Sequence, residues 1–249
     1  MFKQDLTFRT PLMNAAGTLG FFPDRHAPLD WKTLGAFVTN PLSLRPRLPT
    51  AHPELVEYPG GFLLHTGLPN PGLPTAIKKY ARRWSDADLP IIVHLMADRP
   101  EETDRMVQSL EGIENVLAVE LGFAPLLTDD IILLAVEMCL GELPLIVSLP
   151  SEQLLGLGPR TLDAGAAALS LAAPRGALPK NTVLISGRLY GPSLFPQMLE
   201  TVANAAKLGL PVIGSGGVYD NENASAMLEA GALAVQIDSA LWRGFNAGQ

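Results

Sequence analysis

A glycine pair near the C-terminus carries the strongest chemical signal in this chain of 249 residues. The segment Gly214–Val218 reads Gly-Ser-Gly-Gly-Val and follows a short apolar run. Two glycines let an anion approach the backbone closely, and the free N–H groups of a following helix favour the same negative charge. A glycine pair by itself is more often an ordinary strand-to-helix turn whose glycines only bend the chain, because the motif is loose. A phosphate-binding turn is the alternative, which the rest of the chain supports.

Histidine and cysteine side chains give few other catalytic options. His94 lies inside an apolar run, and it becomes a candidate acid or base if its side chain reaches the end of the sheet; otherwise it is a core residue. His65 is a weaker candidate in a loop, where bonding to backbone is preferred, and His26 and His52 are expected to be exposed. Cys139, the single cysteine, follows a helical apolar pattern and excludes internal disulfides, which fits a reducing cytoplasm.

The histidines do not show the spacing of metal ligands, so no metal site is expected. Glu120 ends an apolar run, and a buried carboxylate is costly unless paired. We therefore expect Glu120 to bond a backbone amide or an arginine.

The glycine pair belongs to a strand–turn–helix–strand unit. Val212–Gly214 is the first strand and Leu233–Ile237 the second. Between them, Asp220 and Asn221 are expected to cap a helix that ends at Gly231. Its inward face is expected to consist of Ala224, Met227 and Leu228.

Six further apolar runs predict six more strands, at residues 11–16, 35–39, 90–95, 116–121, 144–149 and 166–171. Helical patterns separate them, at residues 73–84, 98–110, 128–141, 151–164 and 193–208. Asp98 is expected to cap the second of these helices, while Gly156, Gly158 and Pro159 are expected to split the fourth. The proline-rich segment 41–74 is expected to be a long irregular excursion. A second long connection, 173–192, is expected to contain a small strand at 182–185, outside the main sheet.

Eight buried strands alternating with helices predict a (β/α)8 TIM barrel, an α/β fold, as one domain over residues 1–249. A doubly wound open sheet is the alternative. With 47% hydrophobic and 17% charged residues, most strands should be covered on both faces. In such a barrel, function lies at the C-terminal ends of the strands.

Charge and hydropathy exclude several classes of partner. A net charge of −7 argues against nucleic acid and anionic membrane surfaces. The apolar runs are too short to span a bilayer, and the N-terminus lacks the apolar run of a signal peptide, so a cytoplasmic location is expected.

The order and spacing of several segments resemble the dihydroorotate dehydrogenase family along nearly the whole chain. These segments are Pro11–Gly17, Gly35–Thr39, Gly67–Gly72, Gly214–Val218 and Ala234–Ile237. The resemblance implies pyrimidine metabolism, a homodimer, and FMN lying across the strand ends. Its phosphate would lie at Gly216, Gly217 and the turn after the last strand, with the isoalloxazine near Ala16 and Gly17. The implied cofactor-binding residues are Ala16, Gly17, Asn40, Ser148, Arg188, Gly191, Ser215, Gly216, Gly217, Asp238 and Ser239.

Several positions depart from the family pattern. The family lysines align with Asn40 and Ser148, and a family asparagine aligns with Leu64. In the family, a cysteine or serine base takes the C5 proton of dihydroorotate while hydride passes to the flavin. Here the corresponding loop, Gly122–Pro125, contains neither residue. The turn Gly187–Gly191 contains the intruding Arg188 and Tyr190, and Asn70 is expected to fix its own loop rather than touch substrate.

Asp238 replaces a glycine of the expected phosphate turn. At about 4 Å and an effective dielectric constant of 20, two like unit charges repel by roughly 4 kcal/mol. Arg188 either offsets this repulsion or pairs with Asp238 and fills an empty phosphate site, unless Asp238 points away from the turn. Two functional classes follow: an FMN-binding oxidoreductase with lost or altered catalytic residues, or a non-catalytic barrel that binds another phosphorylated small molecule or a partner protein. The colour of the purified protein distinguishes them.

Overall fold

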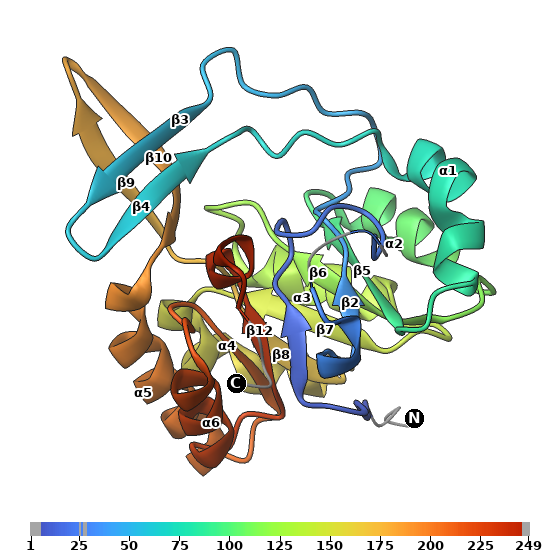
Figure 1. Cartoon of the computed structure of the whole chain (residues 1–249). Helices are drawn as coiled ribbons and strands as arrows, with labels where there is room; N and C mark the ends of the chain where they lie inside the picture. The colour runs from blue at the N-terminus through green and yellow to red at the C-terminus, as the bar shows by residue number, and fades with distance from the viewer. Residues whose placement is uncertain (1–5, 25, 27–28, 246–249) are drawn as a thin grey trace.

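In a computed structural model that describes residues 6–24, 26 and 29–245, eight parallel strands surround a common axis (Figure 1). Their order is β1-β12-β11-β8-β7-β6-β5-β2, and an isolated parallel bridge between Met13 and Ala36 brings β1 beside β2. The fold is therefore the expected TIM barrel rather than an open sheet. The strands are β1 (Leu12–Asn14), β2 (Phe37–Val38), β5 (Ile91–Met96), β6 (Val116–Gly122), β7 (Leu145–Leu149), β8 (Ala168–Leu171), β11 (Val212–Ser215) and β12 (Ala234–Ile237).

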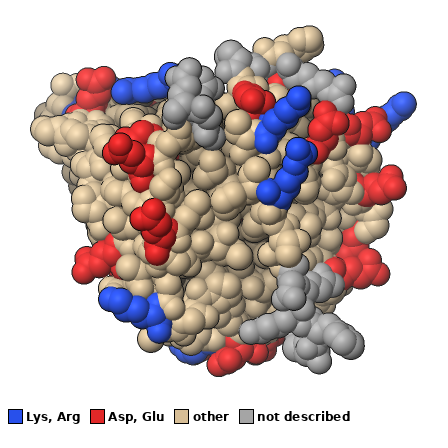
Figure 2. Space-filling model, turned by 60° about the horizontal axis from the view of Figure 1, so that its bottom comes forward, with Lys and Arg blue, Asp and Glu red and all other residues tan. Residues whose placement is uncertain are grey.

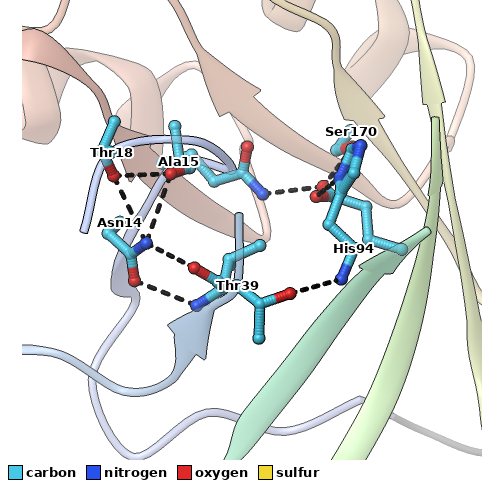
Figure 3. A network of polar contacts seen from close by, with 9 residues as sticks. Asn14, Ala15, Thr18, Thr39, His94 and Ser170 are labelled. Carbon is cyan, nitrogen blue, oxygen red and sulfur yellow. Dashed lines mark hydrogen bonds and ion pairs between the residues drawn. The ribbon is translucent and has the colours of Figure 1, made fainter. Parts of the chain in front are cut away.

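A side chain completes the hydrogen bonding between β1 and β2. Asn14 is fully buried; its Nδ2 donates to the Val38 carbonyl oxygen at 2.6 Å, and its Oδ1 accepts from the Val38 amide at 2.9 Å. Figure 3 shows these bonds on Asn14 beside the loop that carries Ala15 and Thr18. The amide group of Asn14 thus satisfies backbone groups that a neighbouring strand satisfies elsewhere in the barrel.

Alternation along the strands fills the barrel interior. Small alanines and larger aliphatic side chains form one buried cluster, made by Leu6, Met13, Ala36, Val38, Ile92, Ala118, Ile146, Ala168, Ile213 and Ala234. The opposite faces of the strands pack against the helices in a second, larger cluster, which contains Trp84 and Cys139. Cys139 is thus a core residue, as expected, and burial raises the pKa of its thiol to about 12.

Six α-helices lie outside the strands in the described part of the chain, with short 3-10 turns at three places. The α-helices are α1 (Leu73–Ser85), α2 (Pro100–Gln108), α3 (Asp129–Met138), α4 (Ser151–Asp163), α5 (Phe195–Lys207) and α6 (Asn221–Glu229). The 3-10 turns are η1 (Trp31–Thr33), η2 (Pro192–Leu194) and η3 (Ser239–Arg243). None of the helices in the described residues is long and apolar enough to cross a bilayer.

Two expectations about these helices are wrong. Arg99, not Asp98, occupies the N-cap position of α2, so the helix begins one residue later than its acidic neighbour suggests. Helix α4 is continuous through Pro159 rather than split. Its buried residues Leu154 and Leu157 hold it on the barrel, so packing outweighs the hydrogen bond that proline removes.

The two long connections form a second sheet instead of irregular loops. Residues 41–74 contain the hairpin β3 (Glu54–Tyr58) and β4 (Gly61–His65), and residues 173–192 contain β9 (Arg175–Lys180) and β10 (Val183–Tyr190). They form a four-stranded antiparallel sheet in the order β3-β4-β10-β9, which projects beside the barrel above the strand ends (Figure 1). The small strand expected at 182–185 is therefore part of a full hairpin outside the barrel.

The N-terminal face of the molecule carries few charges at its centre. Figure 2 shows acidic and basic side chains around the margin of the face that lies at the bottom of Figure 1, without a continuous basic surface. Such a surface is the electrostatic footprint that nucleic-acid binding requires.

Candidate functional site

A histidine and a glutamate meet inside the barrel near the C-terminal ends of two neighbouring strands. His94 on β5 is in register with Glu120 on β6. The Nδ1 atom of His94 lies 2.6 Å from Oε2 of Glu120, and their side chains are 6% and 1% exposed. Both residues follow the inward-facing phase of their strands, which places the pair among barrel side chains rather than against the helices.

The second carboxylate oxygen of Glu120 is also satisfied. Ser170 on β8 donates its hydroxyl to Oε1 at 2.7 Å, and Gln236 on β12 donates its amide at 2.8 Å. Glu120 thus bonds three side chains, and the expectation of a backbone amide or an arginine is wrong. Burial alone raises the pKa of Glu120, but the hydrogen bond and charge of His94, with those of Ser170 and Gln236, lower it below its ordinary value.

The other ring nitrogen of His94 faces the strand ends. A Cβ atom added to Gly122 would lie 2.4 Å from Nε2 of His94, and Gly122 lies two residues beyond Glu120 toward the C-terminal end of β6. Within the described residues, Nε2 has no hydrogen-bond partner. Since the carboxylate of Glu120 calls for a proton on Nδ1, neutral His94 presents a lone pair at Nε2.

The backbone of His94 is held from the opposite side. Its amide donates to the hydroxyl of Thr39, which follows β2, at 3.0 Å (Figure 3). The ring and the main chain of His94 are therefore fixed by two different strands. Such positioning suits a general base, whose reactive atom must stay within reach of the proton that it removes.

The expected phosphate turn has the backbone shape that the sequence predicts. Gly216 and Gly217 take φ values of +94° and +75°, which side chains rarely adopt. A Cβ atom on Gly217 would also lie 2.4 Å from the amide nitrogen of Phe195 at the start of α5. Both backbone freedom and close approach thus require glycine at position 217.

Asp238 points into this turn. Its Oδ1 accepts hydrogen bonds from the backbone amide and the hydroxyl of Ser239, the latter at 3.0 Å, and the backbone N–H of Gly217 lies near enough to this carboxyl group to favour its charged form. Asp238 is 5% exposed. Burial raises the pKa of Asp238 above its ordinary value, although the bonds from Ser239 and Gly217 act in the opposite direction.

The phosphate end of FMN does not fit this arrangement. The amide of Ser239, which would donate to a phosphate, already donates to a carboxyl group of the same chain, and the amide of Gly217 faces that carboxyl group. A phosphate placed there would meet Asp238 in a buried setting, where like charges repel strongly.

Arg188 reaches the mouth of the barrel from the second sheet. Its Nη1 atom lies 3.5 Å from the position of a Cβ on Gly17, in the turn after β1. On β10, Arg188 is in register with Arg175 of β9, and burial together with the charge of Arg188 lowers the pKa of Arg175. Among the described residues Arg188 and Asp238 form no ion pair, so the pairing suggested by the sequence is not formed.

The remaining predicted cofactor-binding residues divide into two groups. Ser148 and Ser215 lie at the ends of β7 and β11, and Ala16 lies in the turn after β1, so these stand at the barrel mouth. Asn40 also lies there, but its Oδ1 accepts from the amide of Gly20 at 3.1 Å and so fixes the loop after β1. Gly191 instead packs against Gly60 in the second sheet, where a Cβ would lie 2.2 Å from a carbonyl oxygen.

The other singled-out polar residues have structural positions. His65 lies on β4 in register with Glu54, away from the barrel strands. Asn70 accepts from the amides of Ser43 and Gly72 and fixes its loop, as expected. Both His26 and His52 are exposed, as expected. In the part of the chain that the structure describes, His, Cys, Asp and Glu side chains do not form a group of three that could hold a metal ion.

Sequence reasoning did not predict three hydrogen bonds of the polar network. Ser170 and Gln236 bond Glu120, and Thr39 bonds His94. The sequence nevertheless indicated these residues, because each is a polar residue within or directly after an apolar strand. Inward phase on a barrel strand would have placed Ser170 and Gln236 beside Glu120.

An aromatic cluster over the mouth was also missed. Phe62, Tyr190 and Trp242 have ring centroids 5.4 to 6.3 Å apart, and they come from β4, β10 and η3. The indole nitrogen of Trp242 donates to the carbonyl of Thr18 at 2.9 Å, which ties η3 to the loop after β1.

Comparison with known proteins agrees with this architecture. The sequence model of the family described as dihydroorotate dehydrogenase matches residues 3–123. The chain is 30% identical, over 98% of its own length and 87% of the relative's, to the catalytic subunit of dihydroorotate dehydrogenase B (NAD(+)) from Citrifermentans bemidjiense. It is 32% identical to the protein of the same name from Pelobacter propionicus, over 94% of this chain and 84% of that one. This chain therefore belongs to the dihydroorotate dehydrogenase family.

Proposed function

We propose that this chain is a dihydroorotate dehydrogenase-like enzyme with altered catalytic residues, in which His94 performs acid–base chemistry on a small molecule at the barrel mouth. The observation that carries the proposal is the bond between His94 Nδ1 and Glu120 Oε2, which leaves Nε2 unpartnered beside Gly122. Gly122 opens the loop that holds the family base elsewhere. His94 thus offers a base from the neighbouring strand.

The proposed chemistry is proton transfer at Nε2 of His94. The neutral ring takes a proton from the bound molecule, and the positive charge that forms on the ring is stabilised by the carboxylate of Glu120. Ser170 and Gln236 keep that carboxylate oriented. Glu120 acts as a positioning residue, in the way that a buried aspartate orients the histidine of a hydrolase triad.

The experiment separates proton removal from oxidation. Dihydroorotate is incubated with the protein in D2O, and proton–deuterium exchange at C5 is followed by NMR. We expect exchange above the protein-free rate, and a decrease by a factor of about 10²–10⁴ in His94→Asn, the usual contribution of a general base. His65→Asn, the matched control, should exchange as the unmodified protein does. Equal rates for His94→Asn and the unmodified protein would remove His94 from the reaction.

FMN-dependent oxidation is the second candidate function. The family membership favours it, and FMN when bound would supply the hydride acceptor. Ala16, Gly17, Asn40, Ser148 and Arg188 are the residues that would line the ring. Yellow protein with a flavin absorption band supports this candidate, and protein that stays colourless in added FMN contradicts it.

Several broader expectations belong to the same proposal. We propose a role in pyrimidine metabolism, a cytoplasmic location, a homodimer and a single domain over residues 1–249. Sedimentation equilibrium tests the homodimer. Limited proteolysis tests the domain, because a second domain would yield a stable fragment well below the full mass. A non-catalytic barrel that binds a different phosphorylated molecule or a partner protein remains the competing hypothesis, and an active His94 in the exchange assay would exclude it.

A further inference from the structure

We propose that Asp238 is a built-in replacement for a ligand phosphate, so that the glycine turn of this barrel is closed to phosphorylated molecules. The mouth would then take a ligand without a phosphate group, and the barrel would need no bound cofactor to satisfy the turn. This inference is independent of the acid–base role of His94, because none of the contacts used below involves His94 or Glu120.

Hydrogen-bond donors surround the carboxyl group of Asp238. The amide and hydroxyl of Ser239 both donate to Oδ1 of Asp238, and the amide of Gly217, in the glycine turn, lies close enough to favour the charged carboxylate. A cluster of backbone N–H groups at a glycine turn followed by a helix is the arrangement that binds phosphate. Here a side chain of the chain itself takes the position of the anion.

The carboxyl group of Asp238 is also buried. Asp238 is 5% exposed and Ser239 is 2% exposed, so the carboxyl group cannot turn into solvent without breaking the packing around it. The hydroxyl of Ser239 is further held by Tyr219, at 3.0 Å from its phenol oxygen. The replacement anion is therefore fixed from several sides rather than lying loosely in an open site.

The described residues place no compensating cation against the carboxylate of Asp238. In the described part of the chain, Asp238 has no ion-pair partner, and Arg188 lies at Gly17 instead. A phosphate that entered beside an ionised Asp238 would meet a like charge at about 4 Å. At an effective dielectric constant of 20 this repulsion corresponds to a loss of about 10³-fold in affinity.

Paired ligands isolate the contribution of the phosphate. FMN and riboflavin share the ring and differ by the phosphate group, so the ratio of their dissociation constants measures the turn alone. We expect the unmodified protein to bind FMN no more tightly than riboflavin. In Asp238→Gly the ratio should change in favour of FMN by about 10²–10³-fold, and in Asp238→Asn by less, because the amide still occupies the space.

Inorganic phosphate gives a second readout that needs no flavin ring. We expect phosphate at about 10 mM, compared with chloride of equal ionic strength, to raise the melting temperature of Asp238→Gly but not that of the unmodified protein. This concentration is roughly ten times the dissociation constant of a weak anion site, about 1 mM. The control variant is Asp220→Asn, which removes a nearby negative charge at the N-cap of α6 while keeping a capping side chain. In Asp220→Asn, neither the ratio of the FMN and riboflavin dissociation constants nor the effect of phosphate on the melting temperature should differ from the unmodified protein.

Three results would overturn the inference. One is unmodified protein that purifies with FMN or binds FMN at least 100-fold (about 2.7 kcal/mol) more tightly than riboflavin. Another is a folded Asp238→Gly protein, checked by circular dichroism, that gains neither FMN preference nor stabilisation by phosphate. The third is an equal gain in Asp220→Asn, which would show a general charge effect. If Asp238→Gly does not fold, Asp238→Asn supplies the same comparison.

Discussion

The substitution Gly122→Ala tests the central geometry of the proposed active site with a single methyl group. The added Cβ would lie 2.4 Å from Nε2 and 2.8 Å from Cε1 of His94. An ordinary contact needs about 3.4 Å or more, so the ring must move by roughly 1 Å. The backbone of Gly122 does not need a left-handed conformation, and the effect is therefore steric.

The magnitude follows from the bond that the movement breaks. A shift of about 1 Å lengthens the 2.6 Å contact between His94 Nδ1 and Glu120 Oε2 to roughly 3.6 Å, beyond hydrogen-bond range. A bond to a charged group contributes about 1.5–3 kcal/mol. Replacing glycine by alanine returns about 0.4–1 kcal/mol through the unfolded state. We expect a net loss of about 1–2 kcal/mol in the free energy of unfolding.

Urea unfolding followed by circular dichroism measures the loss, and 15N NMR of the histidine ring reports the Nδ1 proton that Glu120 holds. Gly156→Ala is the matched control, since a Cβ there meets nothing within 4 Å outside its own helix backbone. It should stabilise α4 by about 0.5–1 kcal/mol. Unchanged stability of Gly122→Ala, together with a retained Nδ1 proton signal, would refute the described packing of His94.

Three further substitutions test the barrel and its polar interior. Asn14→Ala leaves the Val38 amide and carbonyl unpaired and should cost about 2–4 kcal/mol in urea unfolding, whereas Asn40→Ala, at the exposed end of the barrel, should cost less. Glu120→Gln should cost about 3 kcal/mol at pH 7. Because the folded pKa of Glu120 lies below its unfolded value, its stabilisation is present above the unfolded pKa and is lost as the pH falls through the folded pKa, so the variant and the unmodified protein should converge in acid. Trp242→Phe keeps the ring contacts but loses the bond to Thr18, and hydrogen exchange of residues 239–245 should accelerate with a loss of only about 0.5–1.5 kcal/mol in global stability.

The barrel strands could be predicted because strands that are buried on both faces consist of continuous runs of apolar residues. The strands Ile91–Met96 and Leu145–Leu149 are almost entirely buried. The ends predicted for them from the apolar runs, 90–95 and 144–149, differ from the observed ends by at most one residue. The second sheet could not be predicted in the same way. On β3 exposed and half-buried residues alternate, and β9 contains Pro179, which normally argues against a strand.

Side-chain partners were harder to predict than positions. The sequence places His94 and Glu120 on consecutive strands, but only the register between the strands shows that they lie opposite one another. For Asp238, the sequence gives its place after the last strand, whereas the direction of its side chain depends on the backbone at that residue, with φ −99° and ψ −118°. Neither strand register nor local dihedral angles follow from composition or periodicity.

The pairing of β1 with β12 has a consequence for synthesis of the chain. Met13 is in register with Gln236, so β1 must wait for a partner strand that is synthesised more than 200 residues later. Until then β1 and β11 present unpaired backbone edges, which favour association with other chains. A stalled or truncated product that ends before Ala234 should therefore aggregate, and a chaperone that shields the unfinished edges would act before β12 has been synthesised.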